Sequence, residues 1–321
     1  MIAIVFHRYG SPDDLKIEEV EKPAPKDDEV LIKVHAASVN SWDWELLRGR
    51  PFANRLMFGL RIPKIKTLGA DMAGRVEAVG GNVKRFQPGD EVYGDLSACG
   101  WGGFAEYVCA PENAVILKPA SMTFEQAAVI PQAASMALQG LRDKRQIQSG
   151  QKVLINGAGG GVGTFAVQIA KSFGAEVTGV DSTAKLDLMR SLGADHVMDY
   201  TQEDYTRNGQ CYDLILDVMA HRSISDYKRA LSPKGIFVFV GGSVTLASKI
   251  LFLGPWISMT GSKKISVLLA KPNKDLDCLK SLFEAGKVLP VIDRRYPLAE
   301  VPEALRYLGE GHAQGKVVVT V

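Results

Sequence analysis

Cysteine is scarce in this chain, and the few cysteines show no pairing pattern. The 321 residues include four, none of them in C-x-x-C spacing: Cys99, Cys109, Cys211 and Cys278. This scarcity argues against a disulfide framework and against a zinc lobe built from clustered cysteines. We therefore expect reduced, mostly buried thiols in a cytoplasmic protein.

The chain also lacks a long apolar run and a strong excess of either charge. Its longest apolar region, Thr245 to Met259, contains Lys249 and the Gly254-Pro255 break. It cannot supply the roughly 20 uninterrupted apolar residues of a transmembrane segment. The formal net charge is +2, which gives no electrostatic basis for nucleic acid as the main partner. The length favours two domains, and the 46% of hydrophobic residues is typical of a globular protein.

Short strand-like runs separated by turns dominate the first third of the chain. Val30 to Ala36 and Ala73 to Gly80 are rich in branched residues and end at turn signals. The final segment, Gly315 to Val321, is also strand-like. We expect it to return to this first, mostly β domain, because a lone strand must find a pairing partner.

The central part of the chain alternates between strands and helices. Thr123 to Leu141 is Ala-rich and predicts a helix with a break at Pro131. Four short apolar runs then predict strands, and the segments 163–173 and 184–192 predict the helices between them. The strands are expected at 152–156, 176–180, 213–218 and 235–240. This order predicts a parallel, doubly wound sheet with helices on both faces, the Rossmann form of α/β fold.

The strongest local signal is a glycine-rich turn between the first of these strands and its helix. Small residues there let the backbone approach a pyrophosphate, and the helix N-terminus favours negative charge. An acid, Asp181, follows at the end of the next strand, as in dinucleotide-binding units. The turn consists of Ala158, Gly159, Gly160, Gly161, Val162 and Gly163.

The stretch from Gly150 through Lys171 resembles the signature of the zinc-independent quinone oxidoreductase, or zeta-crystallin-like, family of the medium-chain dehydrogenase/reductase superfamily. Segments 40–49, 102–107, 193–200 and 311–316 also resemble this family. The resemblance implies a Rossmann cofactor-binding domain at 119–290. It also implies a GroES-like catalytic domain made of 1–118 and 291–321, a homodimer, and a nicotinamide cofactor.

The zinc ligands of related alcohol dehydrogenases have no counterparts here. At the matching places stand Asn40 and the segment Gly69-Ala70-Asp71. Neither Asn nor Ala offers the thiolate or imidazole that zinc prefers, so no metal is expected. Without a metal, oxidation of a plain alcohol is hard, whereas an electrophilic acceptor can still be reduced. The family resemblance implies quinones or α,β-unsaturated carbonyls as substrates.

Several further residues are candidates for the site. Asn40 is expected beside the nicotinamide and the substrate carbonyl, with Asp43 orienting it or its loop. The alternative is that both residues only cap a helix. Ser135 and the pair Gly241-Gly242 are expected near the nicotinamide, from the resemblance and from the carboxyl edge of the sheet respectively.

The signals for the cofactor conflict. Asp181 suits the ribose hydroxyls of NADH and repels a 2′-phosphate. Ser182, Thr183 and Lys185 suit that phosphate, and Tyr200 matches a position beside it in NADPH-dependent relatives. We expect NADPH, with NADH accepted because of Asp181. The resulting hypothesis is a hydride transfer to an electrophilic acceptor. A zinc-free alcohol dehydrogenase, or a cofactor-binding structural or regulatory protein without turnover, stays open.

Overall fold

The computed structural model describes residues 1–143 and 146–321, and they form two compact units. The first unit consists of Met1–Ser135, Pro272–Glu284 and Ile292–Val321, and the second of Met136–Lys271 and Ala285–Val291. Residues 119–135 and 272–284 thus group with the first unit, although the sequence assigned them to the Rossmann domain. The physical reason is local pairing: the Gln132 N–H donates to Asp71, and the side chain of Asn273 hydrogen-bonds the backbone of Asp95. The domain boundaries themselves remain a prediction.

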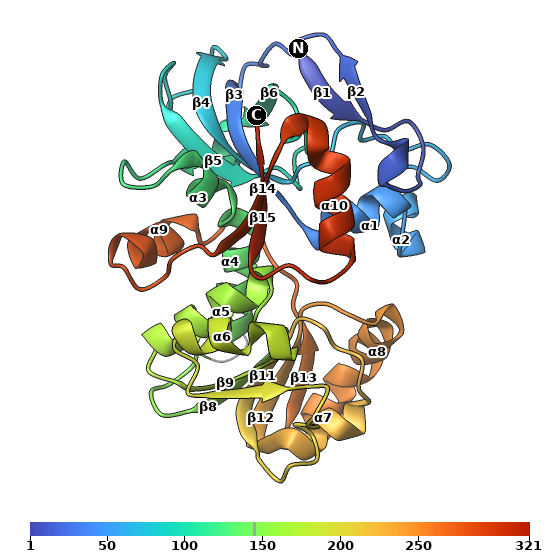
Figure 1. Cartoon of the computed structure of the whole chain (residues 1–321), viewed down its shortest axis with the longest axis vertical. Helices are drawn as coiled ribbons and strands as arrows, with labels where there is room; N and C mark the ends of the chain where they lie inside the picture. Colours follow the sequence, from blue (N-terminus) through green and yellow to red (C-terminus); the bar gives the residue numbers. More distant parts are fainter. Residues whose placement is uncertain (144–145) are drawn as a thin grey trace. The chain divides into compact units, whose positions relative to one another are not determined.

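The first unit is built on a mixed sheet of order β14-β15-β3-β4-β5-β7, with β6 also paired to β3 (Figure 1). A separate hairpin joins β1 and β2. The strands are β1 Ile2–Val5, β2 Lys16–Glu19, β3 Glu29–Val39, β4 Asp71–Val79, β5 Glu91–Asp95, β6 Tyr107–Pro111, β7 Ile116–Leu117, β14 Ile292–Pro297 and β15 Lys316–Thr320. The C-terminal strand β15 pairs antiparallel with β3, so the prediction that it returns to the first domain is confirmed.

Helices of this unit lie along and beside the sheet. They are α1 Ser41–Arg48, α2 Phe52–Phe58, α3 Phe124–Ala128, α9 Leu276–Glu284 and α10 Val301–Gly309, with 3-10 turns at Pro12–Asp14, Glu112–Ala114 and Leu298–Glu300. Helix α10 packs against α1 (Figure 1). Strand β3 is buried on both faces: Val30 and Ile32 belong to one hydrophobic cluster, and Ala37 and Val39 belong to another. The alternation of side chains along a strand places them there.

The second unit contains a parallel sheet of order β10-β9-β8-β11-β12-β13. Its strands are β8 Lys152–Asn156, β9 Glu176–Asp181, β10 His196–Asp199, β11 Tyr212–Asp217, β12 Leu231–Phe239 and β13 Lys264–Val267. Counted along the chain, this is the order 3-2-1-4-5-6 of dinucleotide-binding sheets. The predicted α/β class, with a Rossmann sheet in one unit and a mostly β sheet in the other, is confirmed. The central strand β8 carries the glycine-rich turn at its carboxyl end.

Helices cover this sheet at both ends of the strand order. Helix α5 (Gly161–Ser172) packs on β8 and β9, and α6 (Leu186–Ser191) on β9 and β10. Helix α7 (Ile224–Ala230) packs on β12, and α8 (Val244–Thr260) on β13 (Figure 1). A further helix, α4, spans Pro131–Arg142, so the break at Pro131 separates α3 from α4 as the sequence predicts. Helix α8, by contrast, continues through Pro255.

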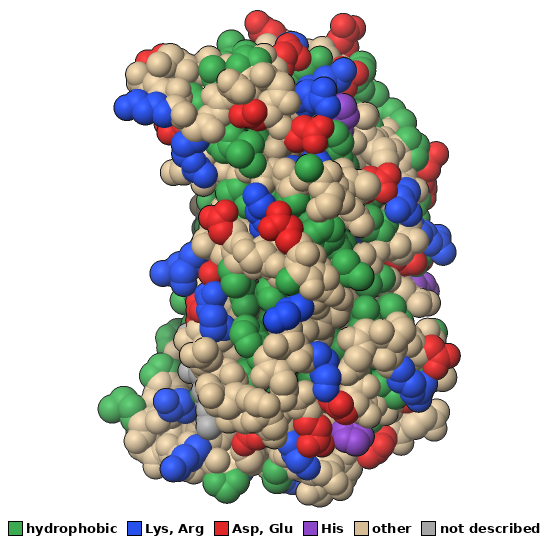
Figure 2. Space-filling view, turned by 90° about the vertical axis from the view of Figure 1, so that its left-hand side faces the viewer, with side chains coloured by type: hydrophobic (Ala, Val, Ile, Leu, Met, Phe, Trp, Pro, Cys, Tyr) green, Lys and Arg blue, Asp and Glu red, His purple; other side chains and the backbone are tan. Residues whose placement is uncertain are grey.

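Two expectations about the surface can be compared with the structure. The cysteines are free, but Cys211 and Cys278 are exposed and the other two are half-buried, so the prediction of mostly buried thiols is wrong. Cys99 lies in a turn and Cys211 just before β11, and only Cys109 and Cys278 lie within a strand and a helix. Within residues 1–143 and 146–321, no helix is long and apolar enough to cross a bilayer. On the face shown in Figure 2, acidic and basic side chains are interspersed.

Candidate active site

The glycine-rich turn has a fixed backbone held by the neighbouring strand. The N–H groups of Gly157 and Ala158 both donate to the Val180 carbonyl, at 2.9 and 3.1 Å. Gly157 has a φ of +79°, a left-handed conformation that glycine adopts without strain. Gly160 then precedes the first residue of α5, whose intrahelical bonding starts when Thr164 N–H donates to the Gly160 carbonyl at 3.0 Å. The N–H groups of Gly161 and Val162 lie in the unpaired first turn.

Gly163 and Gly160 are required at their positions for different reasons. A Cβ atom on Gly163 would lie 2.0 Å from the Gly157 carbonyl oxygen and 2.5 Å from the Ala158 Cα, so helix α5 can meet the turn only through glycine here. A Cβ on Gly160 would have one neighbour, the Gly157 oxygen at 3.4 Å. Gly160 is therefore dispensable for packing, and its open side is where a pyrophosphate would approach.

Asp181 lies at the end of β9 and faces the turn. Its Oδ2 accepts a hydrogen bond from Gly159 N–H at 2.9 Å, and its Oδ1 accepts one from Ser182 N–H at 2.8 Å. The Lys185 ammonium is 3.6 Å from the same Oδ1, and both side chains are buried. The lysine stem crosses Gly159, because a Cβ there would lie 2.7 Å from the Lys185 Cβ. The structure thus brings Asp181, Lys185 and the turn together.

The other residues predicted around the ribose reach this pair in two ways: Ser182 and Thr183 follow Asp181 directly in the chain, whereas Tyr200 follows β10, which pairs with β9. The Thr183 hydroxyl donates a short hydrogen bond to Asp199. The backbone N–H of Tyr200 donates to the Asp181 carbonyl at 3.2 Å, and its side chain is exposed. Ser182 precedes the 3-10 turn Thr183–Lys185. Ser182, Thr183 and Tyr200 thus all lie next to the end of β9, where Asp181 stands.

The carboxyl edge of the sheet is completed by polar contacts that the sequence analysis did not single out. Asn156, at the end of β8, donates to Asp217, at the end of β11, at 2.7 Å. The Asp217 carboxylate also accepts from the Tyr205 hydroxyl at 3.2 Å. Gly242 has a φ of +121°, and a Cβ on it would lie 2.3 Å from the Ala220 carbonyl. The Gly241-Gly242 turn is thus pressed onto the segment that follows β11, at the edge where ligands bind in such sheets.

In the first unit, Asn40 and Asp43 meet at the start of α1. The backbone N–H of Asn40 donates to Asp43 Oδ2 at 2.8 Å, and Gly69 N–H donates to Asp43 Oδ1 at 2.9 Å. Asn40 is the N-cap of α1, so the helix-cap alternative describes its backbone correctly. Both carboxylate oxygens of the fully buried Asp43 hold backbone groups. This geometry makes Asp43 a positioning residue.

The Asn40 side chain lies between a buried cation and a buried anion. Its Oδ1 accepts a short hydrogen bond from the Lys316 ammonium, and its Nδ2 donates to Asp71 Oδ2 at 3.1 Å. Asp71 also accepts from the Ser38 hydroxyl at 3.1 Å and from Gln132 N–H at 3.1 Å. Only the oxygen of an amide can accept from an ammonium, so Lys316 and Asp71 together fix which way the Asn40 amide points.

Strand register explains why these residues meet. Ser38 of β3 stands opposite Asp71 of β4, and Asp71 stands opposite Asp95 of β5. Val317 of β15 stands opposite Val39, which places Lys316 beside Asn40. The result is one buried ammonium among the carboxylates of Asp43, Asp71 and Asp95.

Burial shifts the pKa values of this cluster so that each group favours its neutral form. It raises the pKa of Asp43 to about 7, against the opposing effect of three backbone N–H donors and the Lys316 charge. Burial also raises the pKa of Asp71, aided by repulsion from Asp95 and opposed by Lys316. The pKa of Lys316 is lowered by burial, and the three carboxylates act in the other direction. Each carboxylate here depends on the ammonium for its charge balance.

Ser135, on helix α4, is buried, and its hydroxyl has no hydrogen-bond partner within the described chain. Gln132, one turn earlier, also has a buried and unpaired side-chain nitrogen. Buried polar atoms normally find partners, and a bound ligand is one explanation for an exception. This observation fits the expectation that Ser135 contacts a cofactor.

No cluster of three or more His, Cys, Asp or Glu side chains suited to a metal occurs in residues 1–143 and 146–321. Lys316 and Asp71 were missed as site residues by the sequence analysis. Lys316 had a usable signal, a lysine directly before the apolar run Val317-Val318-Val319. Asp71 had one too, because an acid directly precedes the apolar residues Met72 and Ala73 at the start of strand β4.

Comparison with known proteins places the chain in a family. Residues 26–120 match the alcohol dehydrogenase GroES-like domain, and residues 192–319 match the family described as zinc-binding dehydrogenase. The chain is 33% identical over 333 residues to the chloroplast envelope quinone oxidoreductase homolog of Arabidopsis thaliana, covering 99% of this chain and 98% of that protein. It is 34% identical over 333 residues to the chloroplastic NADPH-dependent alkenal/one oxidoreductase of the same plant, covering 99% and 79%.

A solved structure agrees with these relatives. The quinone oxidoreductase from Coxiella burnetii superposes with a TM-score of 0.88 at 31% identity, covering 100% of this chain and 99% of that one. The chain therefore belongs to the quinone oxidoreductase family of the medium-chain dehydrogenase/reductase superfamily. The family resemblance stated from the sequence is confirmed.

The two glycines of the turn should separate cofactor binding from folding. Gly160→Val should raise the cofactor dissociation constant at least about a hundredfold with an unchanged unfolding temperature, because only the approach path is filled. Gly163→Val should lose stability as well, since its Cβ meets backbone. Fluorescence titration and thermal unfolding measure the two effects. Unchanged cofactor affinity in Gly160→Val would contradict the assignment of the turn.

Removing the buried ammonium should destabilise the first unit in a pH-dependent way. Lys316→Met should cost about 3–5 kcal/mol in unfolding free energy near pH 8, because it leaves buried carboxylates without a cation. The deficit should shrink toward about pH 5, as the raised pKa of Asp71 lets it become neutral. The control Lys152→Met, at a half-exposed lysine, should change stability by under about 0.5 kcal/mol. Equal effects of the two substitutions in urea unfolding would refute this account.

Proposed function

We propose that this protein transfers a hydride from NAD(P)H to a quinone or an α,β-unsaturated carbonyl without a metal ion. The proposal rests on one observation above all. The glycine-rich turn follows the central strand and opens α5, and Asp181 accepts a hydrogen bond from its Gly159 N–H. The names of the two Arabidopsis relatives, a quinone oxidoreductase homolog and an alkenal/one oxidoreductase, support the substrate class.

The cofactor, when bound, supplies the hydride at the nicotinamide C4. The N-terminus of α5, with the first-turn N–H groups of Gly161 and Val162, is suited to the pyrophosphate. The Gly159 N–H already donates to Asp181, so it fixes the conformation of the turn and does not bind the pyrophosphate. Gly241 and Gly242 let the backbone approach the nicotinamide half, and the unpaired Ser135 hydroxyl is suited to the carboxamide.

Lys316 supports the metal-independent reading. Asn40 and Ala70 stand where the resemblance places the zinc-binding Cys and His of related dehydrogenases, and the Lys316 ammonium donates a hydrogen bond to Asn40. The Lys316 ammonium repels a divalent cation from the position of Asn40. Asn40 itself offers an amide in place of the thiolate that zinc prefers. The catalytic contribution expected from the first unit is therefore a fixed neutral amide.

Asn40 and Asp43 have distinct roles in this proposal. Asn40 is buried, and besides its bond to Asp71 its Nδ2 contacts the Ser38 carbonyl oxygen at 3.4 Å. In this proposal the N–H of that longer contact turns to the acceptor oxygen and stabilises its developing negative charge. Asp43 holds the Asn40 and Gly69 backbone from a fully buried position and is not placed to exchange protons with an acceptor. Solvent completes the protonation.

An acceptor screen tests the proposal. We expect oxidation of NADPH or NADH, followed by absorbance, with quinones or enones but not with saturated carbonyls, and no loss of rate with chelators. Alcohol oxidation instead would support a zinc-free alcohol dehydrogenase. Tight cofactor binding without turnover on any acceptor would support a structural or regulatory protein. Stoichiometric zinc with loss of rate on chelation would overturn metal independence.

The preference between NADPH and NADH depends on the Asp181–Lys185 pair. Both oxygens of Asp181 already accept backbone N–H groups, and its charge is offset by Lys185. Asp181 is thus a weaker acceptor for ribose hydroxyls and a weaker barrier to a 2′-phosphate than an isolated carboxylate. We propose weak discrimination in favour of NADPH, which agrees with the name of the alkenal/one relative.

Substitution of either member of the pair should shift the cofactor ratio in opposite directions. Asp181→Ala should raise kcat/KM for NADPH relative to NADH, because repulsion of the 2′-phosphate disappears. Lys185→Ala should lower the ratio. Changes below about threefold in both variants, less than about 1 kcal/mol, would place both residues away from the ribose.

We also propose a homodimer formed through the second unit. Strand β13 ends the sheet order, and α8 packs on it with a largely apolar outer surface. Phe252 is 85% exposed and Trp256 66% exposed, more than a monomer surface favours. Sedimentation should give a dimer at micromolar concentration, and Phe252→Ser/Trp256→Ser should weaken it at least about tenfold. A purely monomeric wild type would refute the dimer.

A further inference from the structure

Helix α2 and the loop after it present a contiguous apolar surface. Phe52, Leu56 and Met57 lie on the outer side of α2, and Leu60 and Ile62 follow it. Each of these side chains is between 55% and 68% exposed. Single exposed apolar residues are ordinary, but five within eleven residues form a patch of the kind that marks an interaction site.

The inner side of α2 is well anchored, so the exposure of its outer side is not the result of a loose segment. The Phe58 ring packs edge-on against Trp42 at 6.4 Å between centroids. The Arg55 guanidinium lies over the Tyr9 ring at 4.8 Å, and the Tyr9 hydroxyl donates to the Gly59 carbonyl at 2.6 Å. The helix therefore has a defined orientation with its apolar side outward.

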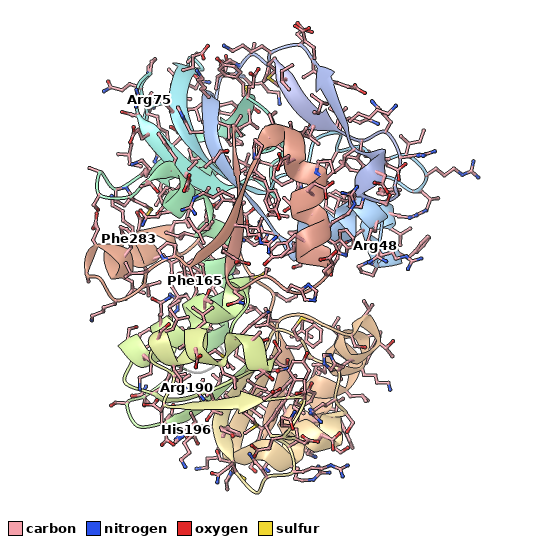
Figure 3. The ribbon with its side chains drawn as sticks, in the orientation of Figure 1. Arg48, Arg75, Phe165, Arg190, His196 and Phe283 are labelled. Atoms are coloured by element: carbon pink, nitrogen blue, oxygen red, sulfur yellow. The ribbon has the colours of Figure 1, made fainter. Side chains whose placement is uncertain are left out.

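The same segment is strongly basic. Residues 46–70 contain no Asp or Glu but six cations: Arg48, Arg50, Arg55, Arg61, Lys64 and Lys66. All except Arg55 have exposed side chains, and Arg48 lies at the end of α1 beside α2 (Figure 3). Because the whole chain carries a net charge of only +2, the remainder of the chain has an excess of acids. The basic charge is thus concentrated around the apolar patch.

We propose that the segment Arg48–Lys66, here called the α2 surface, binds peripherally to an anionic lipid bilayer. Exposed apolar side chains flanked in the chain by exposed Lys and Arg match the two components of an anionic interface, its acyl boundary and its headgroup charge. A second copy of the chain is a poor occupant, because a two-fold contact would bring six cations against six. Such an attachment would also bring the protein to a phase in which apolar acceptors dissolve.

The inference does not depend on the proposed reaction, and its test uses neither cofactor nor acceptor. The full-length protein is mixed with sedimentable vesicles of phosphatidylcholine containing phosphatidylglycerol, or of phosphatidylcholine alone. We expect binding to the anionic vesicles only, decreasing as salt is raised. Leu56→Ser/Met57→Ser should lower the partition coefficient at least about tenfold. Arg61→Gln/Lys64→Gln/Lys66→Gln should lower it by a similar factor.

A matched control uses exposed apolar residues elsewhere in the first unit. Ile17, 55% exposed beside Glu18 and Glu19, and Leu117, 47% exposed, are changed together to Ser and should leave binding unchanged. Thermal unfolding checks that each variant is folded, and the charge variant alters only surface side chains. Absence of binding to anionic vesicles would overturn the proposal and favour an acidic protein as occupant. Equal loss in the control, or binding insensitive to salt, would overturn it as well.

Discussion

The hydrogen bond from the Lys316 ammonium to Asn40 is the contact on which the first unit depends. It ties the C-terminal strand β15 to the end of β3, and it supplies the positive charge that the buried carboxylates of β4, β5 and α1 require. A buried ammonium alone would be costly, and so would the carboxylates. Together they make a neutralised core of polar groups in which the Asn40 amide has one orientation.

The two units use the same device to shape their backbones. In the first unit Asp43 accepts the N–H groups of Asn40 and Gly69. In the second, Asp181 accepts those of Gly159 and Ser182. In both cases a buried carboxylate hydrogen-bonds its own chain segment and a second segment that is distant in sequence, and so holds the two together. Preorganised polar groups of this kind need no rearrangement when charge develops nearby. The residues that look most chemically active in the sequence therefore include several that act by positioning others.

Much of the fold follows from local sequence patterns, and much of the site does not. The strand and helix that flank the glycine-rich turn and the break at Pro131 follow from short-range signals, because periodicity and turn chemistry are local. The meeting of Ser38, Asp71 and Asp95 depends on strand register across three strands, which no local pattern encodes. Lys316 is separated from Asn40 by most of the chain. Helix α8 was read as broken because Gly254 and Pro255 are poor helix formers, but tertiary packing keeps it continuous.

The central claim is a hydride transfer to the β-carbon of an electrophilic acceptor, and isotope transfer tests it most directly. The chelator-treated protein is given cofactor deuterated at both C4 positions and an α,β-unsaturated ketone, and the product is analysed by mass spectrometry and NMR. The account predicts one deuterium on the β-carbon and a solvent hydrogen on the α-carbon. Deuterium on the carbonyl carbon, or a reduced product without deuterium, would contradict it.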